Sequence, residues 1–309
     1  MTRSVLSRET PLFPRPVVRE QYSCGGAANV AWNLAALGPA QTRAFTVFGR
    51  DWRGELLLQA LREVGVDTES VLIDREWTTP FFGKVMLQSG RLQQEDARLD
   101  FINTAALSSE SEEELLARVE AGLPDLDALV VADYQAVGVI TRRVLEGLND
   151  LAARYPRVIF AVDSRERIGQ FWGMVRKPND IEAARWLFPE RAPEQVRIEE
   201  LAEAGLHPQV DCSCPLVITL GDKGCLVLDG GESHLVPALK VAPPIDTVGA
   251  GDTFLAALTL ALAGGAAAVE AARLGHLAAA VTIHKLGITG AASAEEIREI
   301  YEQNFADCG

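Results

Sequence analysis

Two carboxylates, Asp246 and Asp252, flank a short segment that ends in Gly249, Ala250 and Gly251. An apolar helical pattern begins directly after this segment, so the glycines stand at the start of a predicted helix. Free backbone N–H groups at that position can bind an anion, and glycine lets a phosphate approach the backbone closely. A carboxylate beside a phosphate would repel it, so Asp252 is better suited to take a proton from an attacking hydroxyl during phosphoryl transfer. The alternative is a glycine turn in which Asp252 serves only the helix dipole.

A second glycine-rich segment occurs near the N-terminus, where Gly25 and Gly26 precede a predicted helix that contains Asn29 and stops at Gly38. Taken alone, the two glycines could form a simple turn, and Asn29 could be an ordinary polar helix residue. This segment lies about 220 residues before the first motif.

Both motifs resemble signatures of the ribokinase-like (PfkB) carbohydrate kinases. The string DTVGAGDTF at 246–254 resembles the C-terminal signature of that family, and GGAANVA at 25–31 resembles the N-terminal one. Their order along the chain is the order expected in the family. The resemblance implies that Asp252 is the catalytic base and that Gly249, Ala250 and Gly251 form the anion hole.

The same resemblance implies a set of residues that contact a sugar or sugar phosphate. They are Gly25, Gly26, Asn29, Asp51, Lys84, Arg98, Asp133 and Asp246. Lys84 and Arg98 lie on a predicted hairpin, where charged side chains are usually solvated, although a phosphorylated sugar would need cations.

Asn179 and Glu182 are three residues apart at the start of a predicted helix, so their side chains face the same way. Two oxygen ligands of this kind suit Mg²⁺, which usually keeps several waters and binds substrate phosphates. The same spacing also fits a capping box, in which the two residues satisfy each other's backbone N–H groups. The resemblance to the Asn-x-x-Glu motif of the family favours the metal site.

The remaining positions implied by the resemblance concern ATP. The turn at 219–224, TLGDKG, is similar to the family segment beside the ribose and phosphates, and two later positions would flank the adenine. The nucleotide-binding residues implied in this way are Asn179, Thr219, Gly221, Gly224, His276 and Gly287.

Continuous apolar strands are predicted at 128–132, 158–162 and 216–220, with amphipathic helices between them. This alternation indicates a mostly parallel sheet covered by helices on both faces, an α/β fold. Asp133, Asp163 and Gly221 follow these strands, and α/β sheets bind ligands at the carboxyl ends of their strands.

The resemblance narrows the fold class to a single ribokinase-like domain over 1–309, with three α/β/α layers and a small β lid. The lid is expected from about 15–22 and 77–103, with a strand at 16–20 and a hairpin of 79–87 and 91–101. An isolated hairpin of this kind is marginal in water, so we expect a homodimer paired through the lid, with Phe81 or Phe82 near its centre.

Composition limits the partners. The chain has 309 residues and a net charge of −14, which argues against binding nucleic acid or an anionic membrane surface. It starts without a secretory signal, and its five cysteines are scattered, which favours reduced thiols and a cytoplasmic location. The partners that the family resemblance implies are ATP, Mg²⁺ and a small sugar or sugar phosphate.

Further stretches resemble one branch of the family, the heptose 7-phosphate kinases, which phosphorylate the anomeric hydroxyl. They include RLDF at 98–101, ADY at 132–134 and KLG at 285–287. Three features depart from the family pattern: 163–165 is DSR where DPK is usual, YQAVG at 134–138 lacks the customary lysine before its glycine, and no strand ending in Gly-Asp precedes residue 7. Two alternatives therefore stay open. One is a kinase for ribose, fructose or ketodeoxygluconate, and the other is a catalytically weak protein that binds nucleotide or sugar.

Overall fold

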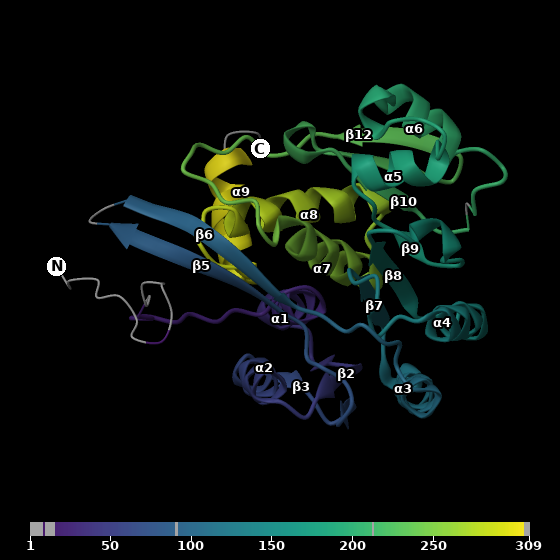
Figure 1. Ribbon diagram of the computed structural model, residues 1–309. Coiled ribbons are helices and arrows are strands. Elements are labelled where there is room, and N and C mark those ends of the chain that lie inside the picture. The colour runs from purple at the N-terminus through teal and green to yellow at the C-terminus, as the bar shows by residue number, and fades with distance from the viewer. Residues whose placement is uncertain (1–8, 10–15, 90–91, 212, 306–309) are drawn as a thin grey trace.

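The structure, a computed structural model shown in Figure 1, describes residues 9, 16–89, 92–211 and 213–305. Its largest sheet over these residues has six strands in the order β12-β11-β10-β9-β8-β7. Strands β7 to β10 are parallel, whereas β11 and β12 continue the sheet antiparallel. The bounds are β7 (Ala128–Asp133), β8 (Ile159–Ser164), β9 (Val175–Arg176), β10 (Leu216–Thr219), β11 (Cys225–Asp229) and β12 (Glu232–Val236).

Helices cover both faces of this sheet (Figure 1). Alternate residues of a strand point to opposite faces, and β10 shows the consequence. Val217 packs with apolar residues of α1, α7 and α8, whereas Leu216 and Ile218 pack with α5 and α6. Helices α3 and α4 share a further cluster with Leu129 of β7 and Phe160 of β8. The predicted three-layer α/β/α arrangement is confirmed. The helices are α1 (Ala27–Leu37), α2 (Trp52–Glu63), α3 (Ser109–Gly122), α4 (Arg142–Arg154), α5 (Asp180–Leu187), α6 (Ile198–Gly205), α7 (Ala250–Ala263), α8 (Ala268–Thr282) and α9 (Ala294–Phe305).

The N-terminal part contributes two small parallel pairs beside the main sheet. Strand β1 (Thr42–Arg43) pairs with β3 (Val66–Asp67), and β2 (Thr46–Gly49) pairs with β4 (Val71–Asp74). Residues 42–49 are thus divided between two strands with different partners. Helix α2 forms the connection between the two halves of each pair.

The hairpin of β5 (Phe81–Ser89) and β6 (Leu92–Phe101) extends away from the three layers (Figure 1). The predicted hairpin is confirmed, with a bulge between Val85 and Met86. The predicted strand at 16–20 is wrong, because these residues form no strand and are exposed to solvent. Proline lacks a backbone donor, and Val17 and Val18 stay uncovered, so this segment adds nothing to the hairpin's edge.

Among the described residues, none of the helices combines the length and the apolar composition that crossing a lipid bilayer requires.

Candidate active site

The N-terminus of α7 supplies the centre of the site. Gly249 caps the helix with a φ of +84°, a left-handed conformation that favours glycine. A Cβ at this position would also lie 2.9 Å from Nδ2 of Asn29, so the contact between α7 and α1 depends on its absence. Ala250 and Gly251 open the helix, and Asp252 is its third residue. The predicted base and the predicted anion hole therefore share one helical turn.

Asp252 accepts hydrogen bonds on both carboxylate oxygens. Asn29 Nδ2 donates to Oδ2 at 2.8 Å, and Tyr134 Oη donates to Oδ1 at 2.8 Å. Asn29 is fully buried on α1, which packs against α7. Asn29, predicted as a sugar ligand, and Asp252, predicted as the base, are thus hydrogen-bonded although they are 223 positions apart in the sequence.

A buried ion pair lies next to this carboxylate. Lys177 Nζ is 2.8 Å from Oδ2 of Asp163, and both side chains are almost inaccessible to solvent. Lys177 follows β9 and Asp163 belongs to β8, so the pair joins the ends of adjacent strands. Nζ would be 3.8 Å from a Cβ built on Gly251, which places a positive charge beside the expected anion hole.

Burial and charge set the protonation of these groups. Burial raises the pKa of Asp252, and the hydrogen bonds from Asn29 and Tyr134 offset part of that effect. Burial alone would lower the pKa of Lys177, but the ion pair with Asp163 outweighs it and leaves the pKa above its usual value. Burial, together with the nearby carboxylates, raises the pKa of Tyr134 well above 10, so its hydroxyl keeps its proton. The site therefore contains a base of increased proton affinity and a permanent cation.

Asp133 ends β7 at the same edge of the sheet but has its own partners. Ser164 Oγ donates to its Oδ2 at 2.6 Å, and Arg167 forms an ion pair with it through two nitrogens. Its side chain is buried. The structure thus places this predicted sugar ligand near the base, in a network that holds the ends of β7 and β8 together.

Two other predicted sugar contacts have structural roles. Asp51 caps α2 by accepting from Gly54 N at 2.9 Å, and its other oxygen accepts from Thr79 N at 2.9 Å. Although burial opposes them, these hydrogen bonds lower the pKa of Asp51. Gly26, with a φ of +53°, begins α1, and a Cβ there would be 3.3 Å from the ring of Tyr134. A Cβ on Gly25 would meet no heavy atom within 4 Å, so that residue borders open space.

Asn179 and Glu182 form a capping box at the start of α5. Asn179 Oδ1 accepts from Glu182 N at 2.8 Å, and Glu182 Oε2 accepts from Asn179 N at 2.8 Å. Burial raises the pKa of Glu182 despite that second hydrogen bond. Within the described part of the chain, no group of three or more His, Cys, Asp or Glu side chains is arranged to hold a metal ion.

The predicted nucleotide residues fall into two groups. In the first group, the end of β10 meets the start of α5, where Thr219 forms a β-bridge with Asn179. Gly221 has a φ of +62° and open space around it, whereas a Cβ on Gly224 would come within 2.0 Å of Val236 O. Gly221 can therefore border a ligand, but Gly224 is required by the packing of β11 against β12.

In the second group, His276 of α8 packs edge-on against Phe254 of α7, with the ring centroids 5.0 Å apart. Burial lowers its pKa to about 4, so the ring is neutral inside the helix interface. The loop before α7 is held by Asp246, which accepts from Val248 N at 3.0 Å and from Gly287 N at 3.1 Å. These contacts connect the predicted sugar ligand Asp246 with the turn predicted to flank adenine.

Residues 14–295 match the family model for pfkB family carbohydrate kinases. The chain belongs to this family. The sequence-based family prediction is confirmed, and with it a carbohydrate kinase as the class of enzyme.

Curated relatives and solved structures agree with this membership. The chain is 33% identical over 303 residues to the bifunctional protein HldE of Bradyrhizobium sp., covering 96% of this chain and 60% of that protein. HldE of Magnetococcus marinus is 32% identical, with 95% and 60% covered. The pfkB domain described here thus spans about three fifths of these relatives.

The similar folds include phosphofructokinase-2 from Escherichia coli in complex with substrates and products, with a TM-score of 0.68, 23% identity, and 94% and 93% of the two chains covered. Ribokinase of Arabidopsis thaliana complexed with ribose and ATP gives a TM-score of 0.69 at 20% identity, with 96% and 92% covered. The ribokinase-like fold is confirmed.

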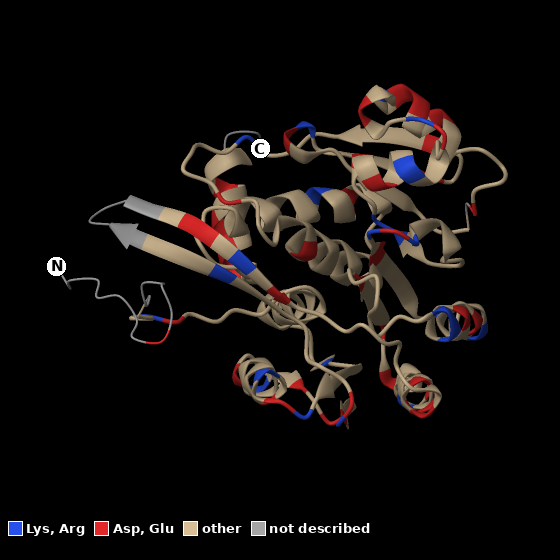
Figure 2. Cartoon of the chain, in the orientation of Figure 1, with Lys and Arg blue, Asp and Glu red and all other residues tan. Residues whose placement is uncertain are grey.

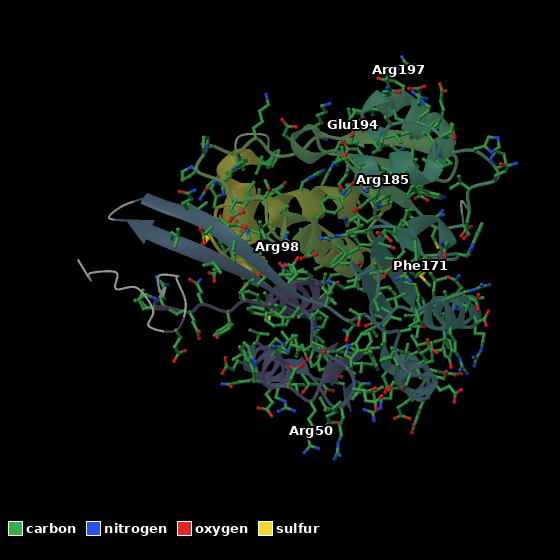
Figure 3. All side chains as sticks on the ribbon, viewed as in Figure 1. Arg50, Arg98, Phe171, Arg185, Glu194 and Arg197 are labelled. Atoms are coloured by element: carbon green, nitrogen blue, oxygen red, sulfur yellow. The ribbon has the colours of Figure 1, made fainter. Side chains whose placement is uncertain are left out.

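The lid of this pfkB protein places Lys84 and Arg98 opposite each other in the strand register. Lys84 is 3.8 Å from Glu95, whereas Arg98 pairs with Asp100 at 2.7 Å and lies over the ring of Phe82. Figure 2 shows charges of both signs along the hairpin, and Figure 3 shows Arg98 near its root. Both cations are exposed and are satisfied within the hairpin, not at Asp252.

Tyr134 and Lys177 are members of the site that the sequence did not assign. Lys177 follows β9, which is only two residues long and gives no recognisable strand pattern. Tyr134 comes directly after Asp133, so the rule that ligands bind at strand ends could have included it. Their roles depend on contacts with residues far away in sequence.

Proposed function

We propose that the protein is an ATP-dependent sugar kinase in which Asp252 is the general base. One observation carries this proposal. A partly buried carboxylate of raised pKa lies in the first turn of a helix whose start is Gly249, and the buried cation of Lys177 is beside it. A base, an anion-binding helix start and a positive charge are the parts that phosphoryl transfer needs.

In the proposed reaction, Asp252 takes the proton of the attacking sugar hydroxyl while the new O–P bond forms. The bond from the γ-phosphorus to the leaving oxygen breaks, and ADP leaves. The N–H groups at the start of α7 and the Lys177 ammonium stabilise the charge of the transferred group. These groups are already in place, so little reorganisation is needed.

The proposed substrate is a heptose 7-phosphate, phosphorylated at its anomeric hydroxyl. This is supported by the similarity to HldE proteins over 96% of the chain and by the stretches at 98–101, 132–134 and 285–287. Lys84 and Arg98 would bind the phosphate already on the sugar. The DSR segment at 163–165 departs from the DPK that is usual in the family. The proposal therefore retains another sugar, such as ribose, fructose or ketodeoxygluconate, as an alternative substrate.

The residues at the start of α5 can supply Mg²⁺ with one or two protein ligands. In kinases this ion takes most of its ligands from phosphates and water and needs only one or two protein carboxylates. Glu182 and Asn179 would hold such a hydrated ion, which supplies charge neutralisation of the phosphates when bound. The capping box shows that both side chains also stabilise the helix start.

The proposed assembly is a homodimer that pairs through the lid, in the cytoplasm. The free thiols of Cys24, Cys214 and Cys225 suit a reducing compartment. Phe81 contacts Trp52 and Tyr22 at the root of the lid, so Phe82, which is exposed, is the better candidate for the dimer centre.

The experiment that tests the function is ADP release from ATP and Mg²⁺ over a panel of sugars and sugar phosphates, with heptose 7-phosphate, ribose, fructose, fructose 6-phosphate and ketodeoxygluconate included. Release that is fastest with the heptose 7-phosphate supports the full proposal. Release that is fastest with another sugar corrects the substrate. Binding of nucleotide or sugar without ADP release from any of them would support the weak binding protein and contradict the kinase.

A further inference from the structure

The hydroxyl of Tyr134 lies between two carboxylates. Its oxygen is 2.8 Å from Asp252 Oδ1 and 3.2 Å from Asp163 Oδ2. A phenol carries one proton, so it donates to only one of these acceptors at a time. The shorter distance favours Asp252 in this structure.

The two carboxylates differ in their other partners. Lys177 Nζ is 2.8 Å from the same Oδ2 of Asp163, so Asp163 has a charged donor whichever way the phenol points. Asp252 is held by neutral donors, Tyr134 Oη and Asn29 Nδ2. The phenol proton therefore matters more to Asp252 than to Asp163.

The ring that carries this hydroxyl has close neighbours in Gly26 and Arg165. A Cβ at Gly26 would be only 3.3 Å from ring atom Cδ2, so the glycine leaves just enough room for the ring. The guanidinium of Arg165 lies over the ring, 5.6 Å from its centroid. Tyr134 also follows directly on Asp133, which Ser164 and Arg167 hold in place. A side chain fixed in this way presents its hydroxyl at a defined point.

We propose that Tyr134 is a positioning residue for the base: its hydroxyl orients the ionised Asp252 and turns to Asp163 when Asp252 becomes protonated. This inference rests on Asp252 as the proposed base. The sugar proton ends on Oδ1 of Asp252, which then donates it in a hydrogen bond to Tyr134 Oη. The phenol keeps its own proton and directs it to Asp163 by rotating about its C–O bond. No proton leaves this group of residues, and no further reactant is required.

Several charges act on Asp252, and their signs define the expected pH effects. Asp163 raises the pKa of Asp252 and Lys177 lowers it, while Glu182 and Arg165 lie in the shell around that ion pair. Burial already favours the protonated form. Removing the Tyr134 donor withdraws a hydrogen bond from the ionised form, so the pKa of Asp252 must rise.

The test compares Tyr134→Phe with Tyr155→Phe, which removes a hydroxyl from a partly buried ring at the end of α4. Carboxyl ¹³C NMR follows the titration of Asp252, whose signal is assigned by its loss in Asp252→Asn. We expect the midpoint in Tyr134→Phe to move up by about one pH unit, a roughly tenfold increase in proton affinity. Tyr155→Phe should titrate as the unaltered protein does. In kinase assays the acidic limb of kcat should move in the same direction, with the KM for ATP unchanged.

Asp163→Asn provides a second variant with the opposite expected sign, because it removes a like charge and leaves Lys177 free to act on Asp252. Its Asp252 midpoint should move down. No shift in folded Tyr134→Phe, or shifts of the same sign in both variants, would overturn the inference. Because the NMR titration does not need turnover, an absence of ADP release from any sugar would contradict the proposed function while this titration still decides the role of Tyr134.

Discussion

The strand-end site and the lid differ in how their charged groups are held. At the strand ends, a largely buried network joins five segments of the chain. Its members are Asn29, Tyr134, Asp163, Lys177 and Asp252, of which Tyr134 and Asp252 are partly buried. In the lid, Lys84 and Arg98 come from two adjacent strands and pair with neighbours on the same hairpin, in solvent.

This difference indicates that the two regions have different roles, catalysis at the strand ends and adaptable binding in the lid. A buried network keeps its geometry without a ligand, as the chemistry of a transfer reaction requires. Rearranging the charges of an exposed hairpin costs little free energy, because surface ion pairs are weak. The hairpin can therefore adapt to a substrate or to a second copy of the chain. Changes at the strand ends should therefore affect kcat, and changes in the lid should affect KM and assembly.

The largest expected effect is that of Asp252→Asn. The substitution keeps the shape and the contact region of the side chain but removes its basicity. A general base contributes about 10²–10⁴-fold, so kcat should fall by that factor while ATP binding stays nearly unchanged. Steady-state ADP release and nucleotide titration measure the two quantities. A variant that keeps the original kcat would exclude Asp252 as the base. It would also contradict the catalytic role that we assign to the strand-end site in contrast to the lid.

The sequence predicted this residue because its surroundings are local. The glycines, the aspartate and the helix that follows lie within one short segment, and their backbone geometry is set there. The contact of Asp252 with Asn29 was not predicted as such, since it depends on the packing of α1 against α7 over 223 positions. Tyr134 and Lys177 were missed for the same reason: their partners, Asp252 of α7 and Asp163 of β8, lie far away in the sequence.

The strand predictions show the same limit. Strands β7, β8 and β10 carry continuous apolar runs and were located within one or two residues of their bounds. Strand β9 has two residues, and residues 16–20 have strand-like composition but no partner. The capping box of Asn179 and Glu182 was predicted only in part. Its spacing fitted both a helix cap and a metal ligand, and the structure shows the cap.

The second prediction concerns the lid charges. In the double variant Lys84→Ala and Arg98→Ala, the KM for a sugar phosphate should rise about tenfold, since the two cations that we propose to bind the phosphate are lost. The kcat and the KM for an unphosphorylated sugar should change little. Both residues are exposed, so the unfolding free energy should stay within ~1 kcal/mol. Arg142→Ala, which breaks a surface pair with Glu146 on α4, is the matched control. A fall in kcat instead would show that the lid takes part in the chemistry.

The third prediction separates the two roles of Glu182. Glu182→Ala removes the hydrogen bond to Asn179 N, which should lower the unfolding free energy by ~0.5–2 kcal/mol. If Glu182 also binds Mg²⁺, the Mg²⁺ concentration for half-maximal rate should rise as well. Glu270→Ala is the control, because Glu270 accepts from Ala267 N in the same way at the start of α8. Thermal melts and Mg²⁺ titrations on both variants decide the matter. Equal Mg²⁺ requirements would leave Glu182 as a helix cap alone.

The smallest expected effect concerns assembly through the lid. Phe82 is 45% exposed on the same face of the hairpin as Lys84, and Leu99 on the other face is 54% exposed. A two-stranded hairpin with uncovered apolar side chains is marginal in water, and pairing about a twofold axis would cover them in both copies. Phe81 is already committed to the aromatic contacts with Trp52 and Tyr22, so a variant there would disturb the root of the lid.

Phe82→Glu would place two like charges near the axis of such a dimer. Sedimentation of the unaltered protein should give twice 33.4 kDa, and the variant should dissociate at several-fold higher concentration. Leu235→Glu puts the same charge on an exposed apolar residue of β12 and should leave the dimer intact. Because Phe82 lies on the hairpin and the proposed base lies at the start of α7, kcat should stay the same. A monomer at micromolar concentration, or equal weakening by Leu235→Glu, would show that the hairpin is not the surface through which copies pair.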